Sequence, residues 1–191
     1  MGHIHVLPGQ FDLTVSAYII RTADQGTPPA LLLHRHKTLG VLLQPGGHVE
    51  LDETPWQAMM REIREETGYE PDQLRLLQPR LRLSSLPGGD LHPVPVGVRS
   101  FPFGDLPHFH TDLTYAFVTN ADPRSAVGAG ESRTLAWFTR DQLTDPALEL
   151  YADVRVLALF ILDHLLVEWE AVPTTPAYPA RLASSSRSNS V

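Results

Sequence analysis

Residues 47–69 read GHVELDETPWQAMMREIREETGY and contain the best-defined helix signals in the chain. These signals predict an α-helix over Pro55–Thr67. Thr54 and Gln57 have the spacing of a capping box, in which two side chains bind the free backbone N–H groups at the start of a helix. Proline suits the first helical position, and Gly68 suits the left-handed residue that ends a helix. Both ends of the helix are therefore predicted from adjacent residues.

The predicted helix has an apolar stripe and an acidic stripe. At about 100° per residue, the apolar stripe contains Trp56, Met59, Met60 and Ile63, and the acidic stripe contains Glu62, Glu65 and Glu66. Like charges three and four residues apart destabilise a helix, and only Arg61 is placed to offset them, by pairing with Glu65. One interpretation is an ordinary solvated face. The other is a functional site, because broken local rules are expected at such sites.

The residues beside the acidic stripe favour the second interpretation. Gly46 and Gly47 lie just before the helix, and carbonyl groups of a glycine loop can approach a ligand closely. Carboxylate and carbonyl oxygens are the ligands that hard divalent cations require, and Mg²⁺ leaves positions for water and substrate phosphate. This arrangement therefore indicates phosphate chemistry.

The same stretch resembles the Nudix box, G-x5-E-x7-R-E-U-x-E-E-x-G-U, in which U is apolar. Gly47 and Glu53 fill the first two fixed positions, and residues 61–69 fill the others, with the aromatic Tyr69 at the last. A chance match in a chain of this length is on the order of one in ten million at average residue frequencies. The order of the predicted elements is also similar to that of the Nudix family over about residues 11–170.

This resemblance implies an α/β fold in which a mixed β-sheet is sandwiched between α-helices. It also implies hydrolysis of a nucleoside diphosphate linked to another moiety X, with Mg²⁺ or Mn²⁺ as the cofactor. By position, the metal ligands would be Glu62, Glu65, Glu66 and the carbonyl group of Gly46. Arg61 would orient the glutamates, and Glu53 would support the loop–helix junction or the groups around the metal ligands.

The general base stays open among three acids. A carboxylate within reach of the attacking water can take its proton, and Glu62 or Glu65 is proposed for this role. Glu131 is a candidate outside the box, in an expected loop before Trp137 where relatives often place an additional acid. A solvated loop acid is an equally good interpretation of Glu131.

The nine histidines raise a rival chemistry. Residues 34–36 and 108–110 each read His-x-His, and side chains two apart on a strand share a face, so either pair could bind zinc or a phosphate. Isolated spacing of this kind is weak evidence, and we expect polar residues at strand edges instead. His48, beside the box, and His110 with Asp112 are expected to line the substrate pocket.

The surrounding sequence predicts short strands and a second helix. Strands are expected at Phe11–Arg21, Ala30–His34, Gly40–Gln44, Leu74–Leu83, Val94–Phe101, His110–Val118 and Leu135–Phe138. The third of these is expected to stop at Gln44–Gly47. A helical turn at Arg140–Leu143 and a buried helix at Asp153–Glu170 follow. We expect one domain over residues 1–170 and a disordered tail over 171–191, whose composition cannot bury a core.

Composition limits the partners. The net charge is -7, and an acidic chain without a basic block offers no footprint for a nucleic-acid polymer. The chain has no cysteine, which suits a reducing compartment, and neither a signal peptide nor a membrane span is apparent. We expect a cytoplasmic protein that is a monomer or a homodimer.

The identity of X is not predicted. Markers downstream of the box distinguish some Nudix subgroups, and residues 84–86, which read Ser-Ser-Leu, match neither the ADP-ribose nor the diadenosine polyphosphate type. A diphosphohydrolase is the leading function because the three box glutamates are intact. The alternatives are a Nudix-fold module that binds a nucleotide without cleaving it and, less favoured, an isomerase on the same scaffold.

Overall fold

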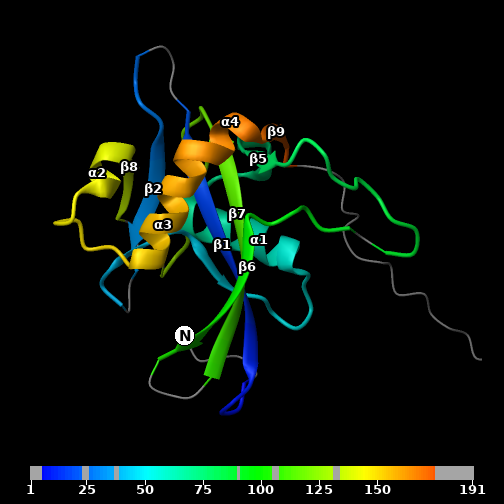
Figure 1. The fold of residues 1–191 in the computed structure, drawn as a ribbon. Helices are drawn as coiled ribbons and strands as arrows, with labels where there is room; N and C mark the ends of the chain where they lie inside the picture. The colour runs from blue at the N-terminus through cyan, green and yellow to red at the C-terminus, as the bar shows by residue number, and fades with distance from the viewer. Residues whose placement is uncertain are drawn as a thin grey trace, which may run out of the picture.

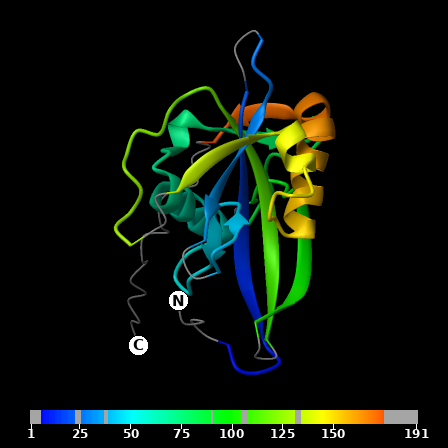
Figure 2. The same ribbon diagram turned by 90° about the vertical axis from the view of Figure 1, so that its left-hand side faces the viewer.

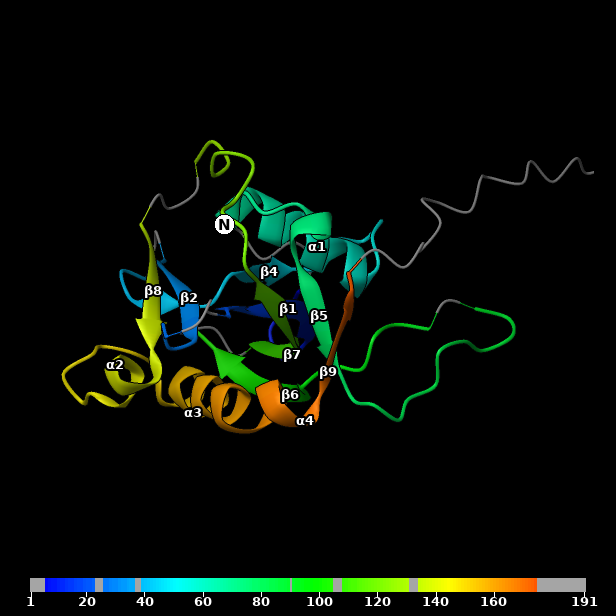
Figure 3. The ribbon, with the colours of Figure 1, turned by 90° about the horizontal axis from the view of Figure 1, so that it is seen from above.

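A mixed β-sheet between helices forms the centre of the molecule. The computed structural model describes residues 6–22, 26–36, 39–89, 91–104, 108–130 and 134–174. In these ranges nine strands form one sheet, and helices pack on both of its faces (Figure 1, Figure 3). This arrangement confirms the predicted fold class.

The strands are β1 (Phe11–Arg21), β2 (Ala30–Arg35), β3 (Leu42–Leu43), β4 (Gly46–His48), β5 (Arg75–Gln78), β6 (Gly97–Phe103), β7 (His108–Thr119), β8 (Leu135–Thr139) and β9 (Glu170–Pro173). The helices are α1 (Pro55–Thr67), the 3-10 turn η1 (Pro71–Gln73), α2 (Arg140–Thr144), α3 (Ala152–Phe160), the π-helical turn η2 (Ile161–Leu165) and α4 (Leu166–Glu168).

The long strands β1 and β7 organise the sheet. They run parallel from the pair Phe11 and Phe109 to the pair Arg21 and Thr119, side by side along the length of the molecule (Figure 2). β4 pairs with the first half of β1, and β2 pairs with its end. On the other side, β6 pairs with the first half of β7 and β5 with its end. Each central strand therefore has two different neighbours along its outer edge, one beside its first half and one beside its end.

Successive residues of β1 point to opposite faces of the sheet and belong to two separate hydrophobic cores. One face of the sheet packs against α1, through a cluster that includes Val15, Ala17, Ile19, Trp56, Met59, Ile63, Tyr115 and Phe117. The other face packs against α3 and η2, through a cluster that includes Tyr18, Ile20, Leu31, Leu33, Ala116, Val154, Ala158, Ile161 and Leu165. Burying each large apolar side chain contributes about 1.5–3 kcal/mol. In the first half of the central pair, the face away from α1 carries polar side chains instead.

Two predicted strands have different bounds because prolines interrupt them. β5 ends at Gln78 rather than at Leu83, since Pro79 lacks the N–H group that the next ladder bond requires. β6 begins at Gly97 rather than at Val94, after a second proline at position 95. The third predicted strand is also shorter and contains only Leu42 and Leu43.

The expectation that Gln44–Gly47 ends a strand is wrong in one respect. Gly46–His48 form β4, which pairs antiparallel with β1 and places Gly46 opposite Ser16. Two adjacent glycines carry no side-chain alternation, so only their distant partner strand makes them part of the sheet.

The end of the described chain also differs from expectation. The last helix is continuous from α3 through η2 to α4 and ends at Glu168, not at Glu170. Residues 171–173, expected in the disordered tail, belong to β9, where Val172 pairs with Leu76 of β5. Residues 175–191 lie outside the described residues. Among the described helices, none has the length and apolar character needed to cross a membrane.

Helix α1 has the predicted bounds. The Thr54 side chain accepts the N–H of Gln57, and the Gln57 side chain accepts the N–H of Thr54, so the capping box is complete. Gly68 ends the helix in the left-handed region at φ 75°, and its N–H donates to the carbonyl of Arg64. The sequence signals and the observed ends agree at both termini.

We expect the Gly68→Ala variant to be less stable than the parent by about 2 kcal/mol or more, because a left-handed alanine costs roughly 1–2 kcal/mol and its Cβ would lie 2.0 Å from the carbonyl oxygen of Ser125. For a domain of this size the melting temperature should fall by about 4 °C or more. Gly88→Ala is the control, since Gly88 also has a positive φ but nothing lies within 4 Å of its added Cβ. Equal shifts for the two variants would contradict the predicted backbone clash.

Candidate active site

The three box glutamates differ in their surroundings. Glu62 and Glu66 are buried, at 9% and 6% exposure, whereas the side chain of Glu65 is 49% exposed. The Glu66 carboxylate accepts the N–H of Gly46 at 2.8 Å. Glu62 lies so close to Gly47 that a Cβ there would be 2.2 Å from its Oε1. A solvated acidic face therefore does not describe Glu62 or Glu66.

Arg61 holds the acidic side chains in place. Its guanidinium group donates to Glu53 at 2.6 Å, to Glu62 at 2.7 Å and to Glu65 at 3.3 Å. It also donates to the carbonyl of His48 at 3.0 Å, which ties β4 to α1. The hydrogen bonds to Glu53, together with the charge of Glu62, raise the pKa of Arg61 although part of the side chain is buried. The expected pairing of Arg61 with Glu65 is confirmed.

Glu53 stabilises the junction between the glycine loop and α1. Burial raises the pKa of Glu53, but the hydrogen bonds from Arg61 and from the N–H of Glu50 outweigh this effect. The net result is a pKa below the ordinary value for glutamate, so Glu53 is ionised at neutral pH and anchors Arg61. This contact matches the supporting role expected for Glu53 at the loop–helix junction.

His34 is a member of the site that the sequence did not assign to it. It lies in β2 at 2% exposure, and its Nε2 is 3.8 Å from the carboxylate of Glu66. Burial, aided by the charge of His36, lowers the pKa of His34 to about 4. The imidazole next to Glu66 is therefore neutral at neutral pH. The expectation of a strand-edge position is wrong for His34, because β2 lies between β3, β1 and β8.

The chain after β7 returns to the box. The N–H of Ser125 donates to Gly68, and the N–H of Gly128 donates to the carbonyl of Glu65 at 2.7 Å. The described part of this loop, up to Gly130, is thus anchored on the end of α1. Glu131 lies outside the described residues, and its role as a candidate base stays a prediction.

The other predicted site residues lie on the sheet face away from α1. Asp112 is 3% exposed and accepts hydrogen bonds from the hydroxyl groups of Thr14, Ser16 and Thr114 at 2.9–3.0 Å. His48 and His110 occupy the same face, because His48 is opposite Thr14 and β7 carries His110 two residues before Asp112. A strand-edge position is wrong for His110 too, since β7 is central to the sheet. The role of these three residues in substrate binding stays a prediction.

The box residues have the chemistry that a hard divalent cation requires. Their potential ligands are the carboxylate oxygens of Glu62, Glu65 and Glu66 and the carbonyl oxygen of Gly46. All three carboxylates accept hydrogen bonds from protein donors, Glu62 and Glu65 from Arg61 and Glu66 from the Gly46 N–H. Oxygen ligands on a preformed frame suit Mg²⁺ or Mn²⁺, so the residues present fit the implied cofactor.

Comparisons with known proteins identify the family of this chain. The sequence model of the NUDIX domain matches residues 12–160. The structure of a hydrolase of the NUDIX family from Clostridium perfringens is 28% identical, with a TM-score of 0.64, and the match covers 80% of this chain and 96% of that chain. No curated protein matches the chain significantly.

Two further structures share the fold at lower identity. The NUDIX domain of Shewanella oneidensis NrtR, complexed with ADP ribose, is 17% identical, with a TM-score of 0.55 and coverage of 76% of this chain and 82% of that chain. A C. elegans Ap4A hydrolase in a binary complex is 16% identical, with a TM-score of 0.55 and coverage of 77% of this chain and 92% of that chain. The NUDIX-domain match over residues 12–160, together with the complete box, shows that the chain belongs to the Nudix hydrolase family, which cleaves nucleoside diphosphates linked to another moiety.

Proposed function

We propose that this protein hydrolyses the diphosphate bond of a small nucleoside diphosphate derivative in a reaction that requires Mg²⁺ or Mn²⁺. The observation that carries the proposal is the fixed arrangement of the buried carboxylates of Glu62 and Glu66 in the C-terminal half of α1. Burying Glu62 and Glu66 is costly, and a protein without catalysis has no chemical need of them. Their retention supports an enzyme over a binding module.

Each box residue has a distinct task in this proposal. Glu62, Glu65, Glu66 and the Gly46 carbonyl hold the cation. When bound, a divalent cation lowers the pKa of water and offsets charge on phosphate oxygens. Arg61 keeps Glu62 and Glu65 in position through hydrogen bonds, and Glu53, which accepts two hydrogen bonds from Arg61, keeps Arg61 in position.

The candidates for the proton acceptor are Glu62, Glu65 and Glu131. Glu65 has a half-exposed carboxylate that solvent can reach, whereas Glu62 is enclosed by Gly47 and Arg61. Of these two described candidates, Glu65 is therefore better placed to take a proton from a water molecule. Glu131 is the third candidate. Its test is the same as for Glu65, a pH–rate profile of the glutamine variant.

The substrate class is a soluble nucleotide rather than a polymer. One structural neighbour is complexed with ADP ribose and another is an Ap4A hydrolase, and both favour a small nucleotide as the ligand. The acidic chain gives no electrostatic support for a nucleic-acid polymer. A monomer or a homodimer is compatible with such a substrate.

A substrate panel with controlled metal tests the proposal. The untagged protein should release mononucleotide or phosphate from at least one member of a set of dinucleoside polyphosphates, nucleotide sugars and ADP-ribose in the presence of Mg²⁺ or Mn²⁺. We expect excess EDTA to abolish this activity, and added Mg²⁺ to restore it. Tight binding of one member without turnover under all metal conditions would instead identify a binding module.

A further inference from the structure

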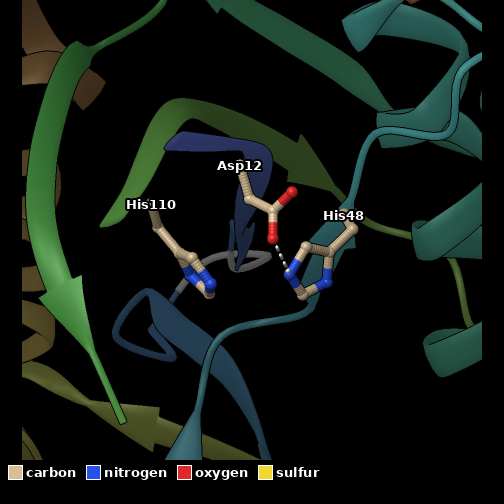
Figure 4. Close-up of side chains that lie close together, drawn as sticks. All are labelled: Asp12, His48 and His110. Carbon is tan, nitrogen blue, oxygen red and sulfur yellow. Dashed lines mark ion pairs between the residues drawn. The ribbon is translucent and has the colours of Figure 1, made fainter. Parts of the chain in front are cut away.

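A compact group of metal-ligating side chains lies apart from the box glutamates. Asp12 of β1, His48 of β4 and His110 of β7 each offer one ligand atom, and these atoms all lie within 4.8 Å of one another. The three side chains converge from neighbouring strands (Figure 4). Among the described residues, this is the one group of three or more carboxylates and imidazoles that meets so closely.

The register of the sheet explains the convergence. Asp12 is directly beside His110 in the parallel pair of β1 and β7. His48 is opposite Thr14 in the pair of β1 and β4. Thr14 and Asp12 are two residues apart and point to the same face of the sheet, so His48 shares this face, and β4 lies on the side of β1 away from β7. Odd-numbered β1 residues such as Val15 face α1, and this group therefore lies across the sheet from the box glutamates.

The distance between the side-chain atoms of His48 and Asp12 is close to that between two ligands of one ion and is too long for a direct hydrogen bond. His48 Nε2 is 3.7 Å from Asp12 Oδ2, beyond the usual hydrogen-bond range of about 2.7–3.2 Å. Ligand atoms around tetrahedral zinc are roughly 3.3 Å apart, as Zn–N distances of about 2.0–2.1 Å require. Small side-chain rotations would bring the three atoms to that spacing.

The surroundings hold this group in place while leaving it reachable. The His110 ring stacks on Phe103 at 4.3 Å between centroids and lies edge-on to His48 at 5.0 Å. The nearby carboxylate of Asp112 is already engaged by three hydroxyl groups and so is not a competing ligand. The His48 side chain retains 20% exposure, which leaves a path for an ion.

We propose that Asp12, His48 and His110 bind a divalent transition-metal ion of the Zn²⁺ type, at a second site separate from the Mg²⁺ or Mn²⁺ site of the Nudix box. Two imidazole nitrogens select zinc-like ions, whereas an all-oxygen set selects Mg²⁺. The two sites are therefore distinguished by ligand chemistry as well as by position. Three protein ligands leave a fourth position for water or an anionic oxygen.

The test is titration of untagged, metal-stripped protein with Zn²⁺ by calorimetry, in excess Mg²⁺ so that the box is saturated. We expect one equivalent of Zn²⁺ to bind, and Co²⁺ to give a visible absorption band at the same stoichiometry. Removing one ligand should weaken binding by about 100-fold or more, since even the partners around metal ligands contribute 10–100-fold. The variants are His110→Ala and Asp12→Asn.

Three controls keep the test specific. His164→Ala removes an exposed histidine of η2 and should leave Zn²⁺ affinity unchanged. The Glu65→Gln/Glu66→Gln variant should also bind Zn²⁺ normally, which separates this site from the proposed hydrolytic one. Zn²⁺ should raise the melting temperature of the parent but not of His110→Ala, with circular dichroism confirming that the variant is folded.

Several results would overturn the proposal. These are no stoichiometric Zn²⁺ binding by the parent, undiminished binding by folded His110→Ala and Asp12→Asn, or loss of binding in the double glutamine variant. His108→Ala is a further test, because the rings of His108 and His110 are 5.3 Å apart. Loss of binding in His108→Ala with full binding in Asp12→Asn would assign the ion to the His-x-His pair instead.

Discussion

The Glu65→Gln/Glu66→Gln variant is expected to lose at least about 100-fold in kcat/KM at saturating Mg²⁺. A bound divalent cation contributes several kcal/mol to transition-state stabilisation, and each 1.36 kcal/mol corresponds to a factor of ten in rate. Glutamine keeps the shape of the side chain but removes the charge that holds the cation. The measurement is steady-state hydrolysis of the best substrate in the panel, as a function of Mg²⁺ concentration.

The fold should survive this change. A glutamine at position 66 can still accept the N–H of Gly46 through its amide oxygen, and position 65 is half exposed. Glu168→Gln, at an exposed position in α4, is the matched control and should keep the parent activity. Hydrolysis by the double variant at the parent rate would show that the metal assignment is wrong.

Alanine substitutions at the adjacent residues Gly47 and Gly46 should have different effects. Gly47→Ala should lower activity with little change in stability, whereas Gly46→Ala should lower both. In Gly47→Ala the added Cβ would lie 2.2 Å from Oε1 of Glu62, and a flexible side chain can move away. The fold should persist, but displacement of this carboxylate by about 1 Å can cost on the order of 100-fold in rate. We expect kcat/KM to fall by about that factor, with little change in melting temperature.

In Gly46→Ala the added Cβ would instead lie 2.2 Å from the backbone oxygen of Val15, in the middle of β1. Backbone cannot yield as a side chain does, so β4 must separate from β1, and both stability and activity should fall. Gly97→Ala is the control, because nothing lies within 4 Å of its added Cβ. A large loss of stability in Gly47→Ala, or none in Gly46→Ala, would contradict this reading of the loop.

Local signals explain what could be predicted from the sequence. The bounds of α1 depend on Thr54, Gln57 and Gly68, which lie beside or within the helix, and both ends are confirmed. The acidic stripe was visible at helical spacing for the same reason. The burial of Glu66 was not, because it depends on Gly46 and on His34, which is far away in sequence.

Non-local pairing explains what could not be predicted. β4 and β9 exist only through their partner strands, β1 and β5, so neither Gly46–His48 nor residues 171–173 carried a strand signal. The proximity of Asp12 to His110 depends on the parallel register of β1 and β7. His48 and His110 are each predicted from the sequence to line the substrate pocket, but nothing in their spacing connects either residue to Asp12.

The parallel pairing of β1 and β7 also has a consequence for the folding kinetics. Thr14 and Asp112, neighbours across this pair, are 98 residues apart in sequence. Contacts of such long range are slow to form, because the entropy of closing the intervening chain must be lost before the strands interact. Helix α1, with local caps at both ends, has no such requirement. We therefore expect α1 to form early and the central strand pair to limit the folding rate, so that the nascent chain acquires its box helix well before the sheet that positions it.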